Sequence, residues 1–344
     1  MNVVYYSSDF FSEMCGVALQ SLCENNQDAD SITIYIVEDN ISVENKKRLA
    51  EITKNFNRKL EFIRMPSQAE IYPEVKINLG RTYARMALAD ILPKKVDRVL
   101  SLDSDTLVFA SLNDMYHIEF GEDEYVGGVF DCVGKAIQSG ILHASDKMKY
   151  CNAGMFLIDL KKWRELDVGK QLLNVVTQNA DGKHTMYFLE QDMMNLVFDG
   201  HVKLLHPRYN MLTSVCMFDY EEILRMKKPV LYYTKSEVLE AKMQPALIHA
   251  TTCFYVQKRM WVEKSDHPFA RFYQDYRNKT GWKKEPQVQD SRKKAKKLYA
   301  KFWHCMPRSM AVRLAAILIN YIRPSYARFT VKINLPTIAE QSVT

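Results

Sequence analysis

The sequence predicts an α/β protein built around a largely parallel β-sheet. Short segments rich in β-branched and aromatic residues alternate with segments of helical periodicity three times in the first hundred residues. This alternation is typical of βαβ units, whose sheets bind ligands beyond the carboxyl ends of their strands. The length of 344 residues and a composition that is 47% hydrophobic and 26% charged fit a globular chain of one or two domains.

The first hundred residues divide into alternating strands and helices. The expected strands are residues 3–7, 32–37, 60–65 and 96–102. The expected helices are residues 16–22, a helix from the N-cap Ser42 to Phe56, and residues 81–92, which Pro93 ends.

The pattern continues beyond residue 120. We expect a strand at 125–130 that ends at Asp131, a turn at 152–154 that leads into an apolar strand, and a helix that opens at 161–164. Three polar side chains precede an apolar segment at 190–196, and His249 ends a short apolar run.

The segment 99–109, VLSLDSDTLVF, is an apolar run interrupted by two carboxylates. Burying a charge is costly unless it is paired or holds a metal. In a strand, Asp103 and Asp105 would leave by one face and converge on a cation, while Ser104 points away. The alternative is a surface turn, the interpretation we give to residues 28–30, where the same Asp-x-Asp spacing lies among polar residues. The apolar context of 103–105 favours a metal site.

Several other classes of site are excluded by their missing motifs. The chain has neither a G-x-G-x-x-G motif after its first strand nor a P-loop motif. Its seven cysteines include no C-x-x-C pair, so the sequence predicts neither a disulfide framework nor a structural zinc site. No apolar run approaches eighteen residues, and no signal peptide is recognisable, so we expect a cytoplasmic protein.

An ordered set of motifs over residues 1–282 resembles glycosyltransferase family 8, whose members are retaining enzymes with the GT-A fold. The motifs are SSD at 7–9, VALQSLCENN at 17–26, TYAR at 82–85, VLSLDSDTLV at 99–108, CNAGMFLIDLKKWR at 151–164, EQDMMN at 190–195, and His249 with Lys258 and Trp261. The resemblance implies a Rossmann-like GT-A domain over 1–282 that binds a UDP-hexose.

The resemblance also implies a metal site formed by Asp103, Asp105 and His249. Two carboxylates and an imidazole favour Mn²⁺, with Mg²⁺ as the alternative. A divalent cation that bridges the pyrophosphate oxygens of the donor neutralises the charge that develops there. The alternative for His249 is a core histidine with satisfied hydrogen bonds.

Nucleotide and sugar contacts follow from the same resemblance. The implied nucleotide-binding residues are Ser8, Asp9 at the uracil and Lys258 at the pyrophosphate; the implied sugar-binding residues are Arg85, Asp131, Asn152 and Glu190. From the residues alone, Asp9 could equally be a helix N-cap, and Arg85 and Lys258 could be solvated surface cations.

The catalytic residues implied are Gln191, Asp192 and Glu190. Gln191 occupies the position where a retaining hydrolase has a carboxylate, and an amide is a poor nucleophile. We therefore expect front-face substitution, with Asp192 or Glu190 as a covalent nucleophile as the alternative. The segment 249–261 departs from the family pattern, because it is longer and lacks the usual Gly and Pro.

The residues after Trp282 form a basic tail, 283–344. Residues 290–328 contain ten Lys or Arg and one acid, a charge of +9, so the overall +6 leaves −3 for the remainder. Aromatic and basic residues interleave in 291–305, and 310–322 is apolar, a pattern typical of amphipathic membrane-surface helices. The tail therefore predicts attachment to an anionic membrane through 291–323. A structural helix and a nucleic-acid site are the alternatives, and we expect no nucleic-acid partner.

Together these features predict a metal-dependent hexosyltransferase at the inner face of the plasma membrane. It would transfer galactose or glucose from a UDP-sugar to a glycan or lipid-linked oligosaccharide of a lipopolysaccharide or capsule. The alternatives are a metal-dependent nucleotidyltransferase, a non-enzymatic nucleotide-sugar binding module and a glycogenin-like enzyme that glucosylates itself.

Overall fold

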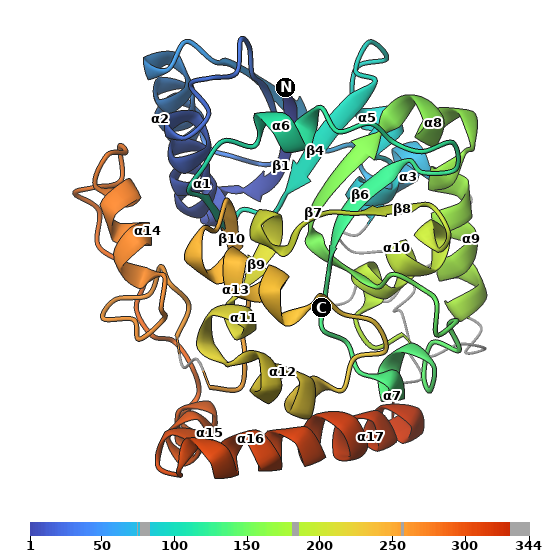
Figure 1. Ribbon diagram of the computed structural model, residues 1–344. Coiled ribbons are helices and arrows are strands. Elements are labelled where there is room, and N and C mark those ends of the chain that lie inside the picture. The colour runs from blue at the N-terminus through green and yellow to red at the C-terminus, as the bar shows by residue number, and fades with distance from the viewer. Residues whose placement is uncertain (74, 76–82, 181–185, 256–257, 331–344) are drawn as a thin grey trace, which may run out of the picture.

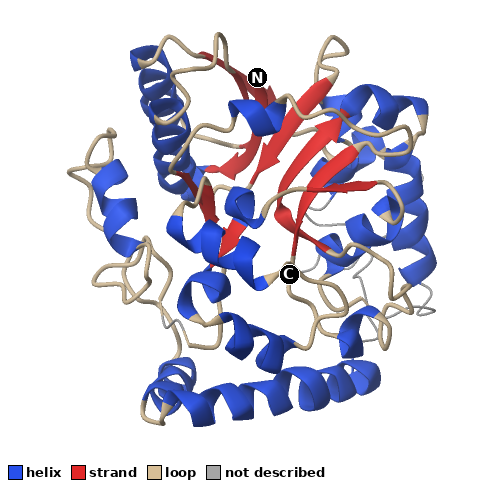
Figure 2. Cartoon of the chain, in the orientation of Figure 1, coloured by secondary structure: helices blue, strands red, loops and turns tan. Residues whose placement is uncertain are grey.

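The computed structural model describes residues 1–73, 75, 83–180, 186–255 and 258–330. Its centre is a seven-stranded sheet with the order β3-β2-β1-β4-β7-β6-β8 (Figure 2). The strands are β1 (Asn2–Ser8), β2 (Thr33–Asp39), β3 (Lys59–Arg64), β4 (Arg98–Leu102), β6 (Val126–Phe130), β7 (Cys151–Asp159) and β8 (Val202–Leu204). All neighbours pair in parallel except β7, which is antiparallel to β4 and β6. The predicted largely parallel sheet is confirmed.

Helices cover both faces of this sheet, because alternate residues of each strand point to opposite sides. Val3 and Tyr5 of β1 belong to the apolar core that contains α1 and α2, whereas Val4 belongs to a second core with α8, α9 and α10. These helices are α1 (Ser12–Glu24), α2 (Val43–Asn55), α8 (Leu160–Glu165), α9 (Val168–Ala180) and α10 (Leu189–Phe198). The predicted N-cap is confirmed, since Ser42 Oγ accepts a hydrogen bond from the amide of Asn45 at 3.3 Å.

A smaller three-stranded sheet, β5-β10-β9, lies beside the carboxyl end of β4. Its strands are β5 (Thr106–Val108), β9 (Met211–Leu212) and β10 (Leu247–His249). β10 runs antiparallel to β5, with His249 opposite Thr106. This pairing brings residues about 140 positions apart in the sequence to the same place.

Short helices connect these strands. They are η1 (Asp9–Phe11), α3 (Gln68–Ile71), α4 (Tyr83–Met86), α5 (Leu88–Ile91), α6 (Asn113–Tyr116), α7 (Lys135–Gln138), η3 (Pro207–Asn210), α11 (Thr213–Met217), α12 (Tyr220–Lys227) and α13 (Lys235–Met243).

Three local predictions differ from the structure. The helix expected at 81–92 is two pieces, α4 and α5, separated at Ala87; residues 81 and 82 lie outside the described residues. The turn expected at 152–154 is wrong, because these residues already belong to β7, where Cys151 pairs with Phe130. The two aspartates do not lie on a strand either: β4 ends at Leu102, and 103–105 form a turn before β5.

Five elements end the described chain: α14 (Ala270–Arg277), α15 (Lys294–His304), α16 (Arg308–Ile317), the π-helical turn η4 (Leu318–Ile322) and α17 (Arg323–Thr330). α14 lies at the left of the view, and α15, α16 and α17 follow one another along its lower edge (Figure 1). Trp303, Ala311, Val312 and Ala315 belong to the same apolar core as β1. The helices thus pack on the body, and the division at Trp282 stays a prediction.

Candidate functional site

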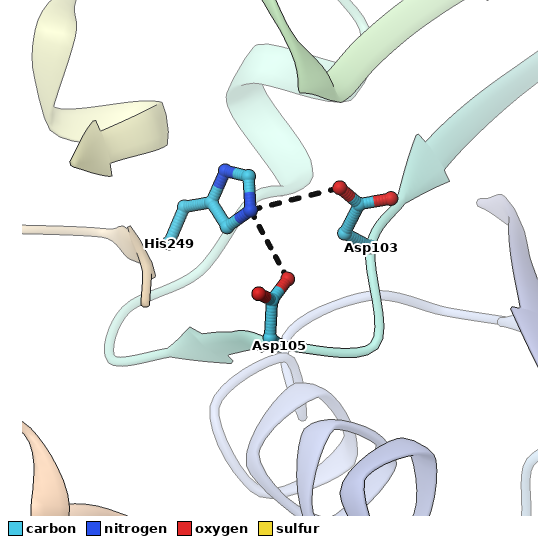
Figure 3. A group of neighbouring side chains, drawn as sticks. All are labelled: Asp103, Asp105 and His249. Atoms are coloured by element: carbon cyan, nitrogen blue, oxygen red, sulfur yellow. Dashed lines mark ion pairs between the residues drawn. The ribbon is translucent and has the colours of Figure 1, made fainter. Parts of the chain in front are cut away.

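Asp103, Asp105 and His249 form a carboxylate–histidine cluster at the carboxyl end of β4 (Figure 3). One ligand atom from each lies within 4.8 Å of the others. His249 Nε2 is 3.0 Å from Asp105 Oδ1 and 3.6 Å from Asp103 Oδ2. Ser104 Oγ donates to the carbonyl of Tyr6 in β1 at 3.1 Å, so this residue anchors the turn while the flanking carboxylates face His249.

The imidazole of His249 is held in one orientation. Its Nδ1 lies 3.0 Å from Oδ1 of Asn152, an acceptor, so Nδ1 carries a proton and Nε2 faces the carboxylates. A Cβ at Gly154 would lie only 2.1 Å from the ring, so a side chain at this position would displace it. The glycine of the CNAG motif therefore provides the space that His249 occupies.

Two arginines flank the cluster. Arg85 forms an ion pair with Asp103, its Nε lies 2.7 Å from Glu190 Oε1, and its Nη1 donates to the carbonyl of Ala153 at 2.6 Å. On the other side, Arg259 Nη1 lies 3.1 Å from Asp105 Oδ2. The two negative charges of the cluster are thus balanced by cations on both sides.

These contacts raise the pKa values of Arg85 and His249 and lower the pKa of Asp105. Burial opposes the charge of Arg85, but Asp103 and Glu190 outweigh it and raise the pKa of the guanidinium. Burial also opposes the charges of Asp105 and His249; their mutual attraction outweighs it, lowering the pKa of Asp105 and raising that of His249. The attraction between Asp105 and His249 therefore favours the charged form of each.

Gln191 and Asn152 form an amide network beside the cluster. Gln191 Oε1 accepts from Asn152 Nδ2 at 3.1 Å and from the amide of Ala153 at 3.0 Å. Its Nε2 donates to Asp131 Oδ2 at 3.0 Å and to the hydroxyl of Tyr150 at 3.2 Å. Because Asn152 also contacts His249, the network connects the predicted catalytic amide to the predicted metal ligand. Their predicted roles toward the sugar stay predictions.

The two carboxylates predicted as alternative nucleophiles have different surroundings. Asp192 is fully buried and accepts hydrogen bonds from the hydroxyl of Tyr150 and the amides of Tyr187 and Phe188. Burial raises the pKa of Asp192 to about 6, although these hydrogen bonds act to lower it. Glu190 pairs with Arg85, and burial, reinforced by Asp103, raises its pKa as well. Asp192 thus stabilises the first turn of α10.

The nucleotide residues predicted at the end of β1 lie near α2. The carboxylate of exposed Asp9 accepts from the amide of Ser42 and from Asn45 Nδ2, both at 2.8 Å. These hydrogen bonds lower the pKa of Asp9. Ser8 is buried and precedes η1. In the described part of the chain, Asp9 accepts no hydrogen bond from the first turn of its own helix, because η1 and α1 begin without a side-chain cap, so the N-cap alternative is wrong. Its contact to a base stays a prediction.

Lys258, predicted at the pyrophosphate, points into its own loop. Its Nζ donates to the carbonyls of Glu263 at 3.2 Å and Lys264 at 2.7 Å. Its sequence neighbour Arg259, which no motif marks, contacts the cluster instead. The basic pair Lys258-Arg259 was a visible signal, but the pattern could not say which cation faces the site.

The sequence pattern also missed Tyr150 and Asn210. Tyr150 joins Gln191 to Asp192, and Asn210 Nδ2 donates to Asn152 Oδ1 at 3.1 Å. Asn210 lies in η3, almost 60 residues from its partner, and no local motif marks it.

The donor set of the cluster fits a divalent cation. It combines two carboxylates with an imidazole nitrogen that faces them, and the second nitrogen is held by a hydrogen bond. Such an outer hydrogen bond orients a ligating histidine. Among the His, Cys, Asp and Glu side chains of the described residues, these three lie close enough together to share an ion.

Comparisons with known proteins agree with the sequence resemblance. Residues 2–252 match the family model described as "Glycosyl transferase family 8". "General stress protein A" of Bacillus subtilis is 22% identical over 82% of this chain and 94% of its own length. "Lipopolysaccharide 1,2-glucosyltransferase" of Escherichia coli is 23% identical over 83% of this chain and 80% of its own.

Solved structures show the same fold. The galactosyltransferase LgtC, crystallised with donor and acceptor sugar analogs, has a TM-score of 0.66 at 23% identity, covering 82% of this chain and 99% of that chain. The bifunctional glycosyltransferase WbbM has a TM-score of 0.67 at 22% identity, covering 83% of this chain and 50% of that one. The predicted GT-A fold, with a helical C-terminal region, is confirmed.

Proposed function

The chain belongs to glycosyl transferase family 8, and we propose that it is a metal-dependent, retaining hexosyltransferase. It takes galactose or glucose from a UDP-sugar and transfers it to a glycan or lipid-linked oligosaccharide in lipopolysaccharide or other surface-polysaccharide synthesis. The names of two relatives support this choice of reaction: a lipopolysaccharide 1,2-glucosyltransferase and, in Salmonella typhimurium, a lipopolysaccharide 1,3-galactosyltransferase.

The observation that carries the proposal is the carboxylate–histidine cluster at the carboxyl end of β4. Asp103, Asp105 and His249 would hold Mn²⁺, with Mg²⁺ as the alternative. When bound, the cation neutralises the charge that develops on the leaving diphosphate. Arg85, anchored by Asp103 and Glu190, adds a buried positive charge next to the donor.

The surroundings of the carboxylates support front-face substitution. In that reaction the bond between the anomeric carbon and the diphosphate oxygen breaks, the bond to the acceptor oxygen forms on the same face, and the acceptor hydroxyl gives its proton to the leaving diphosphate. Asp192 has its oxygens committed to Tyr150 and two backbone amides, and Glu190 is paired with Arg85. Gln191, held through both ends of its amide, contributes dipoles at fixed positions beside the sugar.

The surface of the C-terminal helices supports docking on an anionic membrane. In α16 and η4, Met310, Leu314, Ile317 and Tyr321 are exposed at helical spacing, while Ala311, Val312 and Ala315 are buried on the opposite side. In α15, Leu298 and Phe302 are likewise exposed. We call these six exposed apolar side chains, with the exposed Lys294, Lys296, Lys301, Arg313 and Arg323, the tail face.

Basic amphipathic helices of this kind lie in the membrane interface. No helix in the described ranges is both long and apolar enough to cross a bilayer. A peripheral position at the inner face of the plasma membrane would bring the enzyme to a lipid-linked acceptor.

Nucleotide binding provides the first test. Titration calorimetry with UDP, GDP and CDP in the presence of Mn²⁺ should show binding that prefers UDP and requires the metal. The Asp103→Asn/Asp105→Asn variant should lose this binding. Asp28→Asn/Asp30→Asn, the same spacing in the exposed segment, is the matched control and should bind as the wild type does.

The reaction itself is tested by product analysis. With a UDP-hexose, Mn²⁺ and a truncated lipopolysaccharide acceptor, the enzyme should release UDP. Release of pyrophosphate would indicate a nucleotidyltransferase instead. UDP binding that needs no metal would contradict the assignment of the cluster.

A further inference from the structure

Two adjacent cations, Lys258 and Arg259, follow β10, and they point in different directions. The ammonium of Lys258 donates to the carbonyls of Glu263 and Lys264, and its backbone amide donates to Asp266 Oδ1 at 3.1 Å. These hydrogen bonds connect the two ends of the loop 258–266, and they direct the ammonium of Lys258 toward the loop's own carbonyls. Arg259 instead reaches back to the cluster.

Arg259 is well placed to bind an anion next to a metal. Its Nη1 contacts Asp105 Oδ2 at 3.1 Å and the carbonyl of Ala250 at 2.7 Å, and its guanidinium lies 5.3 Å from the ring centre of Trp261. Asp105 meets His249 through its other oxygen, Oδ1. If a cation bound between Asp103, Asp105 and His249, the guanidinium of Arg259 would lie next to it, in contact with Oδ2 of Asp105.

The guanidinium retains donors for a ligand. An arginine has five N–H donors in a planar fork that matches phosphate oxygens. Among the residues that the structure describes, hydrogen bonds of Arg259 involve Nη1, and none involves Nε or Nη2. The side chain is 37% exposed, whereas Arg85 on the other flank is 13% exposed and is held by Asp103, Glu190 and Ala153.

We infer that Arg259, rather than Lys258, is the cation of this loop that binds the diphosphate of the donor. This inference rests on the proposed function, since it assumes that a nucleoside diphosphate binds at the cluster. It reassigns the role that the family resemblance gave to Lys258. The altered spacing of residues 249–261 is consistent with the change, because an insertion before the basic pair shifts which cation faces the metal.

Calorimetry of UDP and UMP with Mn²⁺ tests the assignment. Arg259→Gln should weaken UDP binding roughly 10- to 100-fold, the value of one hydrogen bond between charged groups. UMP, which lacks the second phosphate, should lose less. Lys258→Gln should weaken UDP binding less than Arg259→Gln does, and Lys264→Gln, which removes an exposed charge from the same loop, controls for the general loss of positive potential.

A second measurement separates loss of a ligand contact from damage to the site. Arg259 shares Asp105 with the metal, so Arg259→Gln removes a competing cation and should leave Mn²⁺ binding without nucleotide unchanged or stronger. A variant that merely distorts the cluster would weaken it. Arg259→Lys should recover part of the UDP affinity.

Each outcome decides between the proposals. If Lys258→Gln weakens UDP binding as much as Arg259→Gln or more, the inference is overturned and the proposed function stands. Weaker Mn²⁺ binding in Arg259→Gln without nucleotide would also overturn the inference. If the wild-type protein shows no Mn²⁺-dependent UDP binding, the proposed function fails, and the inference fails with it.

Discussion

The carboxylate–histidine cluster and the tail face differ in how their charges are balanced. Each carboxylate of the cluster lies within 4 Å of cationic side chains, from His249 and from Arg85 or Arg259. On the tail face, the described residues offer no ion-pair partner to Lys294, Lys296 or Lys301, although Lys297 and Arg292 pair with Asp290. Balanced charge on partly buried side chains indicates a preorganised site, whereas unbalanced exposed charge indicates a surface for an anionic partner.

The two regions are nevertheless connected through aromatic side chains. Phe254, in the segment that follows β10, contacts Trp303 of α15 with ring centres 4.8 Å apart. Tyr255 stacks on His304 at 4.4 Å, and its carbonyl is 2.5 Å from His304 Nε2. A segment that leads to Arg259 therefore packs directly on the first helix of the tail.

The largest expected effect is on the free energy of unfolding, and it should differ between the buried and the exposed side of α15. Trp303 is 3% exposed, so Trp303→Ala should lower the free energy of unfolding by about 3–5 kcal/mol. The neighbouring Phe302 is 55% exposed, and Phe302→Ala should change it by less than about 0.5 kcal/mol. Denaturant unfolding measures both. Equal effects would contradict the assignment of Trp303 to the body core.

The tail face can be weakened without touching the cluster. Lys294→Gln/Lys296→Gln/Lys301→Gln should reduce binding to phosphatidylglycerol vesicles by about 3 kcal/mol, on the order of 100-fold, since each charge near an anionic surface contributes about 1 kcal/mol. Vesicle sedimentation measures the loss. UDP binding with Mn²⁺ should not change. Equal binding of the wild type to neutral phosphatidylcholine vesicles would refute the electrostatic part of the proposal.

A substitution at Gly154 should do the reverse, because it disturbs the cluster and leaves the tail face unchanged. Gly154→Ala places a methyl group where the ring of His249 lies, so hexosyl transfer should fall on the order of 100-fold, the upper range for disturbing the support of a metal ligand. Binding to anionic vesicles should be retained. An activity within about threefold of wild type would show that the ring can move aside or does not bind the metal.

The smallest expected effect is on the free energy of unfolding, and it comes from the ion pair that joins α16 to α12. The guanidinium of Arg308 hydrogen-bonds Glu222 of α12, and this hydrogen bond lowers the pKa of Glu222 below its ordinary value of 4.5. A carboxyl group whose folded-state pKa is lowered contributes stability above its unfolded-state pKa and loses it as the pH falls through the folded-state value. Glu222→Gln should therefore cost at most about 1 kcal/mol at pH 7.

This difference should shrink as the pH falls below the ordinary pKa of 4.5 and through the lowered folded-state pKa of Glu222, and it should disappear once the carboxyl is protonated in both states of the wild type. Unfolding in urea from pH 3 to pH 7 checks the dependence. The glutamine is the matched replacement, because its amide oxygen can still accept the hydrogen bond from the backbone of Asp219 at the start of α12. A constant difference over the whole pH range would contradict this role of the ion pair.

The sequence by itself determined the α/β class, the position of most strands of the main sheet along the chain, and the pair Asp103 and Asp105. These features are local: apolar periodicity reports the buried face of each element, and the apolar context of VLSLDSDTLVF marks carboxylates at the end of a buried strand. The basic amphipathic character of the tail was also readable, since it depends on spacing within each helix.

Only the tertiary structure decided which distant side chains meet. His249 reaches the aspartates because β10 pairs with β5, a contact that spans about 140 residues. Asn210 supports Asn152, and Arg259 rather than Lys258 faces Asp105, through loop conformations that no periodicity encodes. Local patterns record which face of an element is buried, whereas the identity of the partner across a site depends on long-range packing.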